Sequence, residues 1–171
     1  MTLLKGFEPV IRRNCRVLVL GSMPGVASLQ QQQYYAHPRN AFWPIMEELF
    51  AIDKNSEYAE RCSMLCSKKI ALWDVLKACK RKGSLDSRID AYSELANDFD
   101  RIFSAYQSIN AVFFNGATAE RLYKKHILGT GLVEDKRMFY CRLPSTSPAY
   151  AAMTFNEKLQ HWRRIFEHLS A

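Results

Sequence analysis

The sequence predicts an α/β protein, a three-layer α/β/α sandwich with a central four-stranded, mostly parallel sheet. Two observations lead to this fold class. Four short apolar runs have the length of buried strands, and segments of helical periodicity separate them. Strands that alternate with helices form parallel sheets covered on both faces. The length of 171 residues fits one such domain, over residues 1–171.

The expected strands share a continuous apolar character that is typical of burial on both faces. They lie at residues 16–21 (RVLVLG), 70–75 (IALWDV), 111–115 (AVFFN) and 138–143 (MFYCRL). Each is followed by residues that favour turns, so each strand has a defined carboxyl end.

The expected helices are amphipathic segments at residues 42–50, 56–68, 93–106, 118–126 and from 154 onward. Pro44 suits the first turn of the first of them. Thr154 and Glu157 have the spacing of a capping box, which marks the start of the last helix. Beyond it, apolar residues recur at steps of three or four, so this helix buries one face.

The charge of the chain favours a polyanionic partner. Lys and Arg number 24 against 17 Asp and Glu, which gives a net charge of +7. The apolar runs are too short to span a membrane, and the first residues carry no apolar signal core. We therefore expect a cytoplasmic protein with no membrane partner. We also expect a monomer.

No motif indicates a metal or a cofactor. The five cysteines are an odd number without a CxxC pair, and none of the four histidines falls in HExxH. Cys62 and Cys66 would share a helix face, which suits either a metal or, as we favour, burial as small apolar groups. The nucleotide fingerprints GxGxxG and GxxxxGK[ST] are absent. The expectation is no metal and no cofactor.

The segments after the strands carry the chemistry, because parallel α/β sheets bind ligands at the carboxyl ends of their strands. GSMPG at residues 21–25 is followed by a long loop rich in aromatic and amide side chains. There Tyr35 can stack on a planar base, and Asn40 can orient a water molecule. Alternatively, the aromatic residues belong to the core and Asn40 caps the helix that follows.

Two further segments have groups that bind phosphate. Basic and hydroxyl side chains follow the second strand, and three hydroxyls between two prolines follow the fourth. A solvated charge run and an ordinary turn are the alternatives. After the third strand, the Asn115-Gly116 pair forms a turn whose amide would face the same pocket. The candidate phosphate ligands are Lys80, Arg81, Lys82, Ser84, Ser87, Ser145, Thr146 and Ser147.

Together, these segments resemble the uracil-DNA glycosylase superfamily. GSMPG looks like its first motif, YAHPRNAFW at residues 35–43 is similar to the aromatic-A-H-P-x-N-x-F-W segment of its mismatch-specific branch, and LPSTSPA at residues 143–149 occupies the place of the loop that enters the minor groove. The hypoxanthine (deoxyinosine) DNA glycosylases look closest, since they also share GSLDS after the second strand. The similarity runs from about residue 17 to residue 150.

The resemblance implies a role for each pocket residue. Asn40 would be the catalytic residue that positions water, because the first motif has Met23, which cannot activate water, where many relatives have Asn or Asp. Ser22 and Met23 would contact the base through backbone groups, Tyr35 would stack on it, and Asn115 would be a second functional amide. The four-cysteine iron–sulfur pattern of another branch has no counterpart here.

The implied activity is base excision repair: flipping of a deaminated base, chiefly hypoxanthine, and hydrolysis of its N-glycosidic bond in DNA. The pocket segments contain no lysine, so we expect no lyase activity. Two alternatives remain, a uracil or broad-specificity mismatch glycosylase and a catalytically silent lesion-binding module. The silent module is considered because Met23 cannot activate water. A nucleoside hydrolase is a more distant alternative.

Overall fold

The computed structural model describes residues 1–130 and 138–171. The helices are α1 (Val26–Gln31), α2 (Phe42–Phe50), α3 (Tyr58–Ser67), α4 (Phe99–Ala105), α5 (Ala117–His126) and α6 (Phe155–Ser170). The strands are β1 (Leu3–Lys5), β2 (Val17–Gly21), β3 (Ile70–Asp74), β4 (Leu76–Lys80), β5 (Leu95–Ala96), β6 (Ala111–Asn115) and β7 (Phe139–Leu143). Three short 3₁₀ turns are η1 (Asp86–Arg88), η2 (Ala91–Ser93) and η3 (Leu128–Thr130).

The four predicted strands form one sheet in the order β3-β2-β6-β7, with every neighbouring pair parallel. β2 and β3 are buried along their whole length, as expected for strands of continuous apolar sequence. The predicted α/β class is confirmed.

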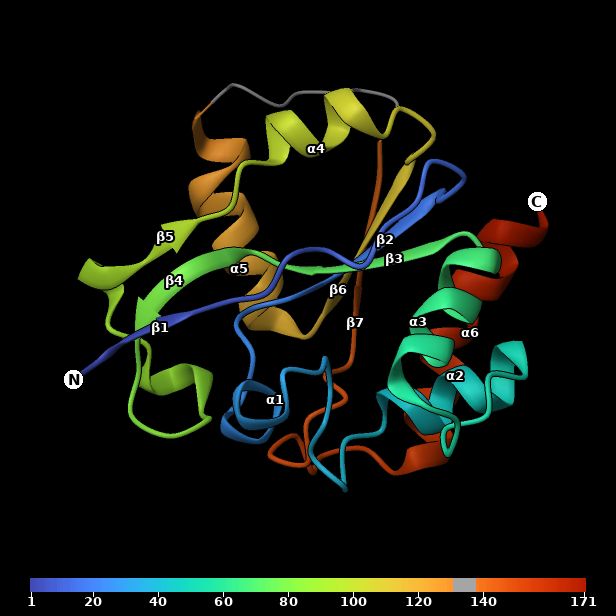
Figure 1. Cartoon of the computed structure of the whole chain (residues 1–171), viewed down its shortest axis with the longest axis horizontal. Helices are drawn as coiled ribbons and strands as arrows, with labels where there is room; N and C mark the ends of the chain where they lie inside the picture. The colour runs from blue at the N-terminus through green and yellow to red at the C-terminus, as the bar shows by residue number, and fades with distance from the viewer. Residues whose placement is uncertain (131–137) are drawn as a thin grey trace.

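Helices cover both faces of this sheet. Side chains from α4 and α5 pack with Leu18, Leu20 and Phe114 on one face, and side chains from α2 and α6 pack with Val19 and Phe113 on the other. Figure 1 shows the two groups of helices on opposite sides of the strands. Alternate residues of β2 and β6 therefore belong to two separate apolar layers, which is the consequence of a pleated strand buried on both faces.

A second, antiparallel sheet differs from the prediction. It has the order β1-β4-β5, and β4 follows β3 after a single residue, Val75. The lysines of residues 76–80 (LKACK) suggest the start of a loop. In the structure Lys77 and Lys80 are exposed, whereas Ala78 and Cys79 between them are buried. The register shifts between Leu76 and Ala78, so exposure does not alternate regularly along this strand.

Two helices also differ from the prediction. The segment expected as a helix from residue 93 begins with η2 and β5, and α4 starts only after Asp98, whose side chain accepts a hydrogen bond from the Arg101 N–H. The long loop after β2 contains the short helix α1. The last helix begins as predicted, because Thr154 and Glu157 form both hydrogen bonds of a capping box.

The carboxyl ends of the four parallel strands open toward the same side of the molecule. Figure 1 shows α1 and the loop before α6 gathered at this side, in the lower part of the view. None of the helices in residues 1–130 and 138–171 combines the length and the apolar character needed to cross a membrane.

Candidate active site

A cavity of about 480 Å³ lies at the carboxyl ends of the parallel strands. Its walls come from the segments after β2, β4, β6 and β7 and from the loop between α1 and α2. This volume is within the range of pockets that hold a small molecule or a single base. The predicted site residues that line it are Ser22, Met23, Tyr35, Asn40, Ser84, Ser87, Asn115, Ser145, Thr146 and Ser147.

Asn40 is held in one orientation by the start of α2. Its side-chain oxygen accepts a hydrogen bond of 2.9 Å from the backbone N–H of Phe42. This bond identifies the oxygen end of the amide and leaves a second lone pair on Oδ1 together with both N–H donors. Asn40 therefore has the local helix-start interaction that was the alternative interpretation, and it also lines the cavity.

The Tyr35 ring is fixed between the core and the cavity. It stacks on Phe42 with ring centroids 4.2 Å apart, so one face of the ring is covered. Its backbone has a φ of 56°, in the left-handed region that non-glycine residues seldom adopt. The hydroxyl is buried, and burial raises the pKa of Tyr35 well above its usual value. The ring is neutral and preorganised, and the residue lines the cavity.

Arg81 holds the loop after β2 in place through hydrogen bonds. The guanidinium is buried, donates to the carbonyl oxygens of Gly83, Met23 and Pro24, and lies 3.6 Å from a carboxylate oxygen of Asp86. The predicted phosphate contact of Arg81 is therefore replaced by an internal role, because its donors face protein carbonyls instead of solvent. The sequence could not distinguish the two, since a buried and an exposed arginine look alike in a basic run.

Ser22 and Met23 are also held by the surrounding loops. The Ser22 hydroxyl donates to Asp86 at 2.7 Å, and its carbonyl accepts from the Leu76 N–H. With the Met23 carbonyl facing Arg81, the carbonyls of both residues are occupied within the protein.

Asn115 and Thr146 join the end of β6 to the loop after β7. The Asn115 amide donates to the Thr146 hydroxyl and accepts from the Thr146 N–H, both at 2.9 Å. Thr146 is buried, so this predicted phosphate ligand serves to position Asn115 and the loop. The loop is further anchored to α6, since Trp162 donates to the Pro144 carbonyl and Lys158 donates to the Tyr150 carbonyl.

Nearly the whole chain matches a known family. The family model of the uracil DNA glycosylase superfamily matches residues 8–170. The chain belongs to this superfamily. The family that the strand-end motifs resemble is thus confirmed, and the match extends well beyond those motifs.

Relatives within the uracil DNA glycosylase superfamily are similar over most of their length. A hypoxanthine DNA glycosylase of Methanosarcina acetivorans is 35% identical over 167 residues, which cover 96% of this chain and 98% of the relative. One of Methanosarcina barkeri is 41% identical over 113 residues, 66% of this chain and 70% of the relative. The solution NMR structure of a candidate uracil DNA glycosylase from M. acetivorans has a TM-score of 0.81 at 31% identity, covering 99% of this chain and all of that one.

The sequence-based prediction of the site omitted one buried acid, Asp74. Asp74, the last residue of β3, lines the cavity and is only 4% exposed. Asp86, within the GSLDS segment, lines it too. The available signal was an aspartate at the carboxyl end of an otherwise apolar strand, where the ligands of such sheets bind. In the part of the chain that the structure describes, no three His, Cys, Asp or Glu side chains gather closely enough to hold a metal ion.

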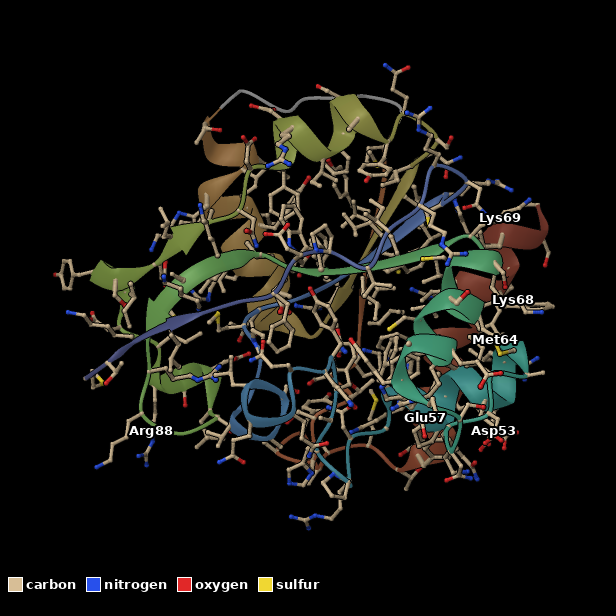
Figure 2. The ribbon with its side chains drawn as sticks, viewed as in Figure 1. Asp53, Glu57, Met64, Lys68, Lys69 and Arg88 are labelled. Carbon is tan, nitrogen blue, oxygen red and sulfur yellow. The ribbon has the colours of Figure 1, made fainter. Side chains whose placement is uncertain are left out.

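Basic side chains lie outside the cavity of this uracil DNA glycosylase fold. Lys80 and Lys82, which were predicted to bind phosphate, do not line it, but both are exposed on the segment that supplies Ser84 and Ser87 to its wall. Figure 2 shows Arg88 from the same segment pointing away from the ribbon into solvent. These three cations are free to meet a larger anionic partner beside the cavity.

Proposed function

We propose that the protein is a DNA repair glycosylase that hydrolyses the N-glycosidic bond of deaminated bases in DNA, chiefly hypoxanthine. The observation that carries this proposal is the oriented Asn40 amide, which lines the same cavity as the Tyr35 ring. The names of the two Methanosarcina relatives support hypoxanthine as the base. Uracil is the second candidate base, because amide and backbone groups can also meet a pyrimidine edge.

Each pocket group has a place in this reaction. The target nucleotide would be flipped out of the duplex into the cavity, at a free-energy cost of a few kcal/mol. Tyr35 would stack on the base, and the N–H groups of Ser22 and Met23 would bond its edge, with Asn115 as a second amide at the site. The Phe42 N–H leaves one lone pair of Asn40 Oδ1 to accept a proton of the attacking water, which orients the water oxygen toward C1′.

The same geometry supports a monofunctional enzyme. Lyase activity needs an amine nucleophile at the sugar, and no lysine is among the described residues that line the cavity. The phosphates on either side of the flipped nucleotide would be contacted by Lys80, Lys82, Ser84, Ser87, Ser145 and Ser147. The single-domain organisation, the monomeric state and the cytoplasmic location stay predictions.

The test is base release from a duplex with one hypoxanthine, read as strand cleavage before and after alkali. We expect cleavage only after alkali, and a loss of about 100-fold or more in the single-turnover rate for Asn40→Ala. Asn156→Ala, an exposed asparagine on α6, is the matched control and should keep the wild-type rate. Binding of the lesion without release of hypoxanthine, uracil or xanthine would instead identify a silent binding module, and borohydride trapping on DNA would contradict the monofunctional assignment.

A further inference from the structure

The Asp74 carboxyl and the Tyr35 hydroxyl both lie beside Gly21, and each has a buried polar atom that lacks a hydrogen-bond partner among the described residues. Within the described residues, neither Asp74 Oδ2 nor the Tyr35 hydroxyl has a hydrogen-bond partner. A Cβ placed on Gly21 would lie 2.4 Å from Asp74 Oδ1 and 3.4 Å from the Tyr35 hydroxyl. The absence of a side chain at Gly21 therefore makes room for the carboxyl group. An unsatisfied buried carboxyl is costly to the fold, so its position in the wall of the cavity calls for a ligand.

The surroundings of Asp74 favour its neutral form. Burial is the largest influence and raises the pKa of Asp74 to about 7, with a further contribution from the nearby carboxyl of Asp86, while Arg81 opposes the shift. Asp86 is itself held by the Ser22 hydroxyl. Tyr34 and Tyr35 are the other titratable groups beside Asp74, and burial raises the pKa of both phenols, so both stay protonated. At neutral pH a large share of Asp74 thus carries a proton.

In the proposed reaction, the proton on Asp74 can neutralise the negative charge that develops on the departing base. When the N9–C1′ bond breaks, its electron pair stays with the purine, which becomes negatively charged. An ionised carboxylate in the cavity wall would oppose this charge, whereas a neutral carboxyl can donate to it. The most basic ring nitrogen of a 6-oxopurine nucleoside is N7, and protonation there makes the base a better leaving group.

We propose that Asp74 is the general acid that protonates N7 of the departing hypoxanthine. This inference rests on the proposed glycosylase function. In the step, the Asp74 O–H proton moves to N7, and the N9–C1′ bond breaks with its electron pair going to the base. The water held by Asn40 forms the new C1′–O bond. Its released proton returns to the Asp74 carboxylate through solvent, so the enzyme is restored and the products are neutral hypoxanthine and an abasic site.

The first test is the pH profile of single-turnover hypoxanthine release for wild type and Asp74→Asn. The asparagine keeps the shape and the ability to donate a hydrogen bond, but it cannot transfer a proton. We expect Asp74→Asn to be about 100-fold slower at pH 6. The wild-type rate should fall tenfold per pH unit above about pH 7, and this decline should be missing in the variant. A variant with the wild-type rate and the same decline would overturn the proposal.

A second test changes the substrate instead of the protein. 7-Deazahypoxanthine has a carbon in place of N7 and offers no basic site there. We expect the wild-type enzyme to release it at least about 100-fold more slowly than hypoxanthine, and Asp74→Asn to lose nothing further on this base. Equal rates of the wild-type enzyme on the two bases would show that N7 receives no proton.

Two controls separate the effect of Asp74 from that of neighbouring titratable groups. His37 also lines the cavity and is another side chain there that could transfer a proton to the base. If Asp74 is the acid, His37→Gln should keep the decline above pH 7. Asp100→Asn, which removes an exposed carboxylate on α4, should match wild type throughout.

Failure of this inference is distinguishable from failure of the proposed function. If wild type releases hypoxanthine and Asp74→Asn does so with an unchanged profile, the glycosylase stands and the general acid is wrong. If wild type releases no base from any lesion duplex, the proposed function itself fails.

Discussion

The Asp74 carboxyl couples the stability of the fold to pH. Its pKa of about 7 in the folded protein, raised chiefly by burial, lies above the ordinary value of about 3.9 in an unfolded chain. The folded state therefore holds this proton more tightly, and stability declines as pH rises from about 4 through about 7. A pKa shift of this size lowers the free energy of unfolding by about 3–4 kcal/mol at pH 8.

We therefore expect Asp74→Asn to have a higher free energy of unfolding than wild type at pH 8, by about 2–4 kcal/mol. At pH 4, where both side chains are neutral in the folded protein, the two proteins should be nearly equal. Urea unfolding at the two pH values measures the difference, and other titrating groups cancel because both proteins share them. A difference that does not change with pH would contradict the raised pKa.

Single residues of the site were predictable where they belong to a recognisable motif. Asn40, Tyr35, Ser22 and Asn115 stand in segments of unusual composition, and all four line the cavity. Asp74 is a lone acid at the end of an apolar strand, and nothing in the linear sequence indicates that its oxygen lacks a partner. That property depends on Gly21, which is distant in the chain and becomes its neighbour only when β2 and β3 pair.

At the scale of elements, Arg81 joins the end of β4 to the loop after β2. Replacing it with methionine removes the donors to three carbonyl oxygens and leaves the Asp86 carboxyl without this cation. We expect Arg81→Met to lower the free energy of unfolding by about 2–4 kcal/mol, because buried acceptors left without donors carry the desolvation cost. Hypoxanthine release should fall as well, since Ser22 and Met23 lose their support.

Chemical denaturation of Arg81→Met beside Lys82→Met measures this effect. Lys82 is the exposed neighbour in the same basic run, and its replacement should change stability by less than about 0.5 kcal/mol. Equal stability of the two variants would mean that Arg81 does not support the loop.

The elements that were predictable from the sequence are those with one strong signal. The four parallel strands are continuous apolar runs, and α6 carries its capping box. β4 escapes prediction because part of it faces solvent and its lysines resemble those of a loop. β1 and β5 are three and two residues long, too short for periodicity to register, and they are strands only because β4 lies between them.

At the scale of the whole molecule, the net charge of +7 predicts DNA binding that weakens with salt. Each cation that contacts a phosphate contributes about 0.9 to the slope of log affinity against log salt on duplex DNA. We expect Lys82→Ala and Arg88→Ala each to reduce the magnitude of that slope by about 1. The measurement is fluorescence anisotropy on a lesion duplex across a range of salt concentrations.

A matched control comes from the other end of the sheet. Lys68 follows α3 near the amino end of β3, and Figure 2 shows it far from Arg88. Lys68→Ala should leave the slope unchanged. If all three variants reduce the slope alike, the basic residues act as a diffuse charge and the segment after β4 does not mark the DNA-facing side.

The walls of the cavity come from distant parts of the chain, from Gly21 to Tyr150, and the last wall is fastened by Lys158 and Trp162 of α6. During synthesis on the ribosome, a chain that stops before α6 would have all four parallel strands, but its closing loop would lack the hydrogen bonds from Lys158 and Trp162. Closure of the cavity therefore comes last along the chain, because the helix that helps to anchor its final wall follows every segment that supplies a wall.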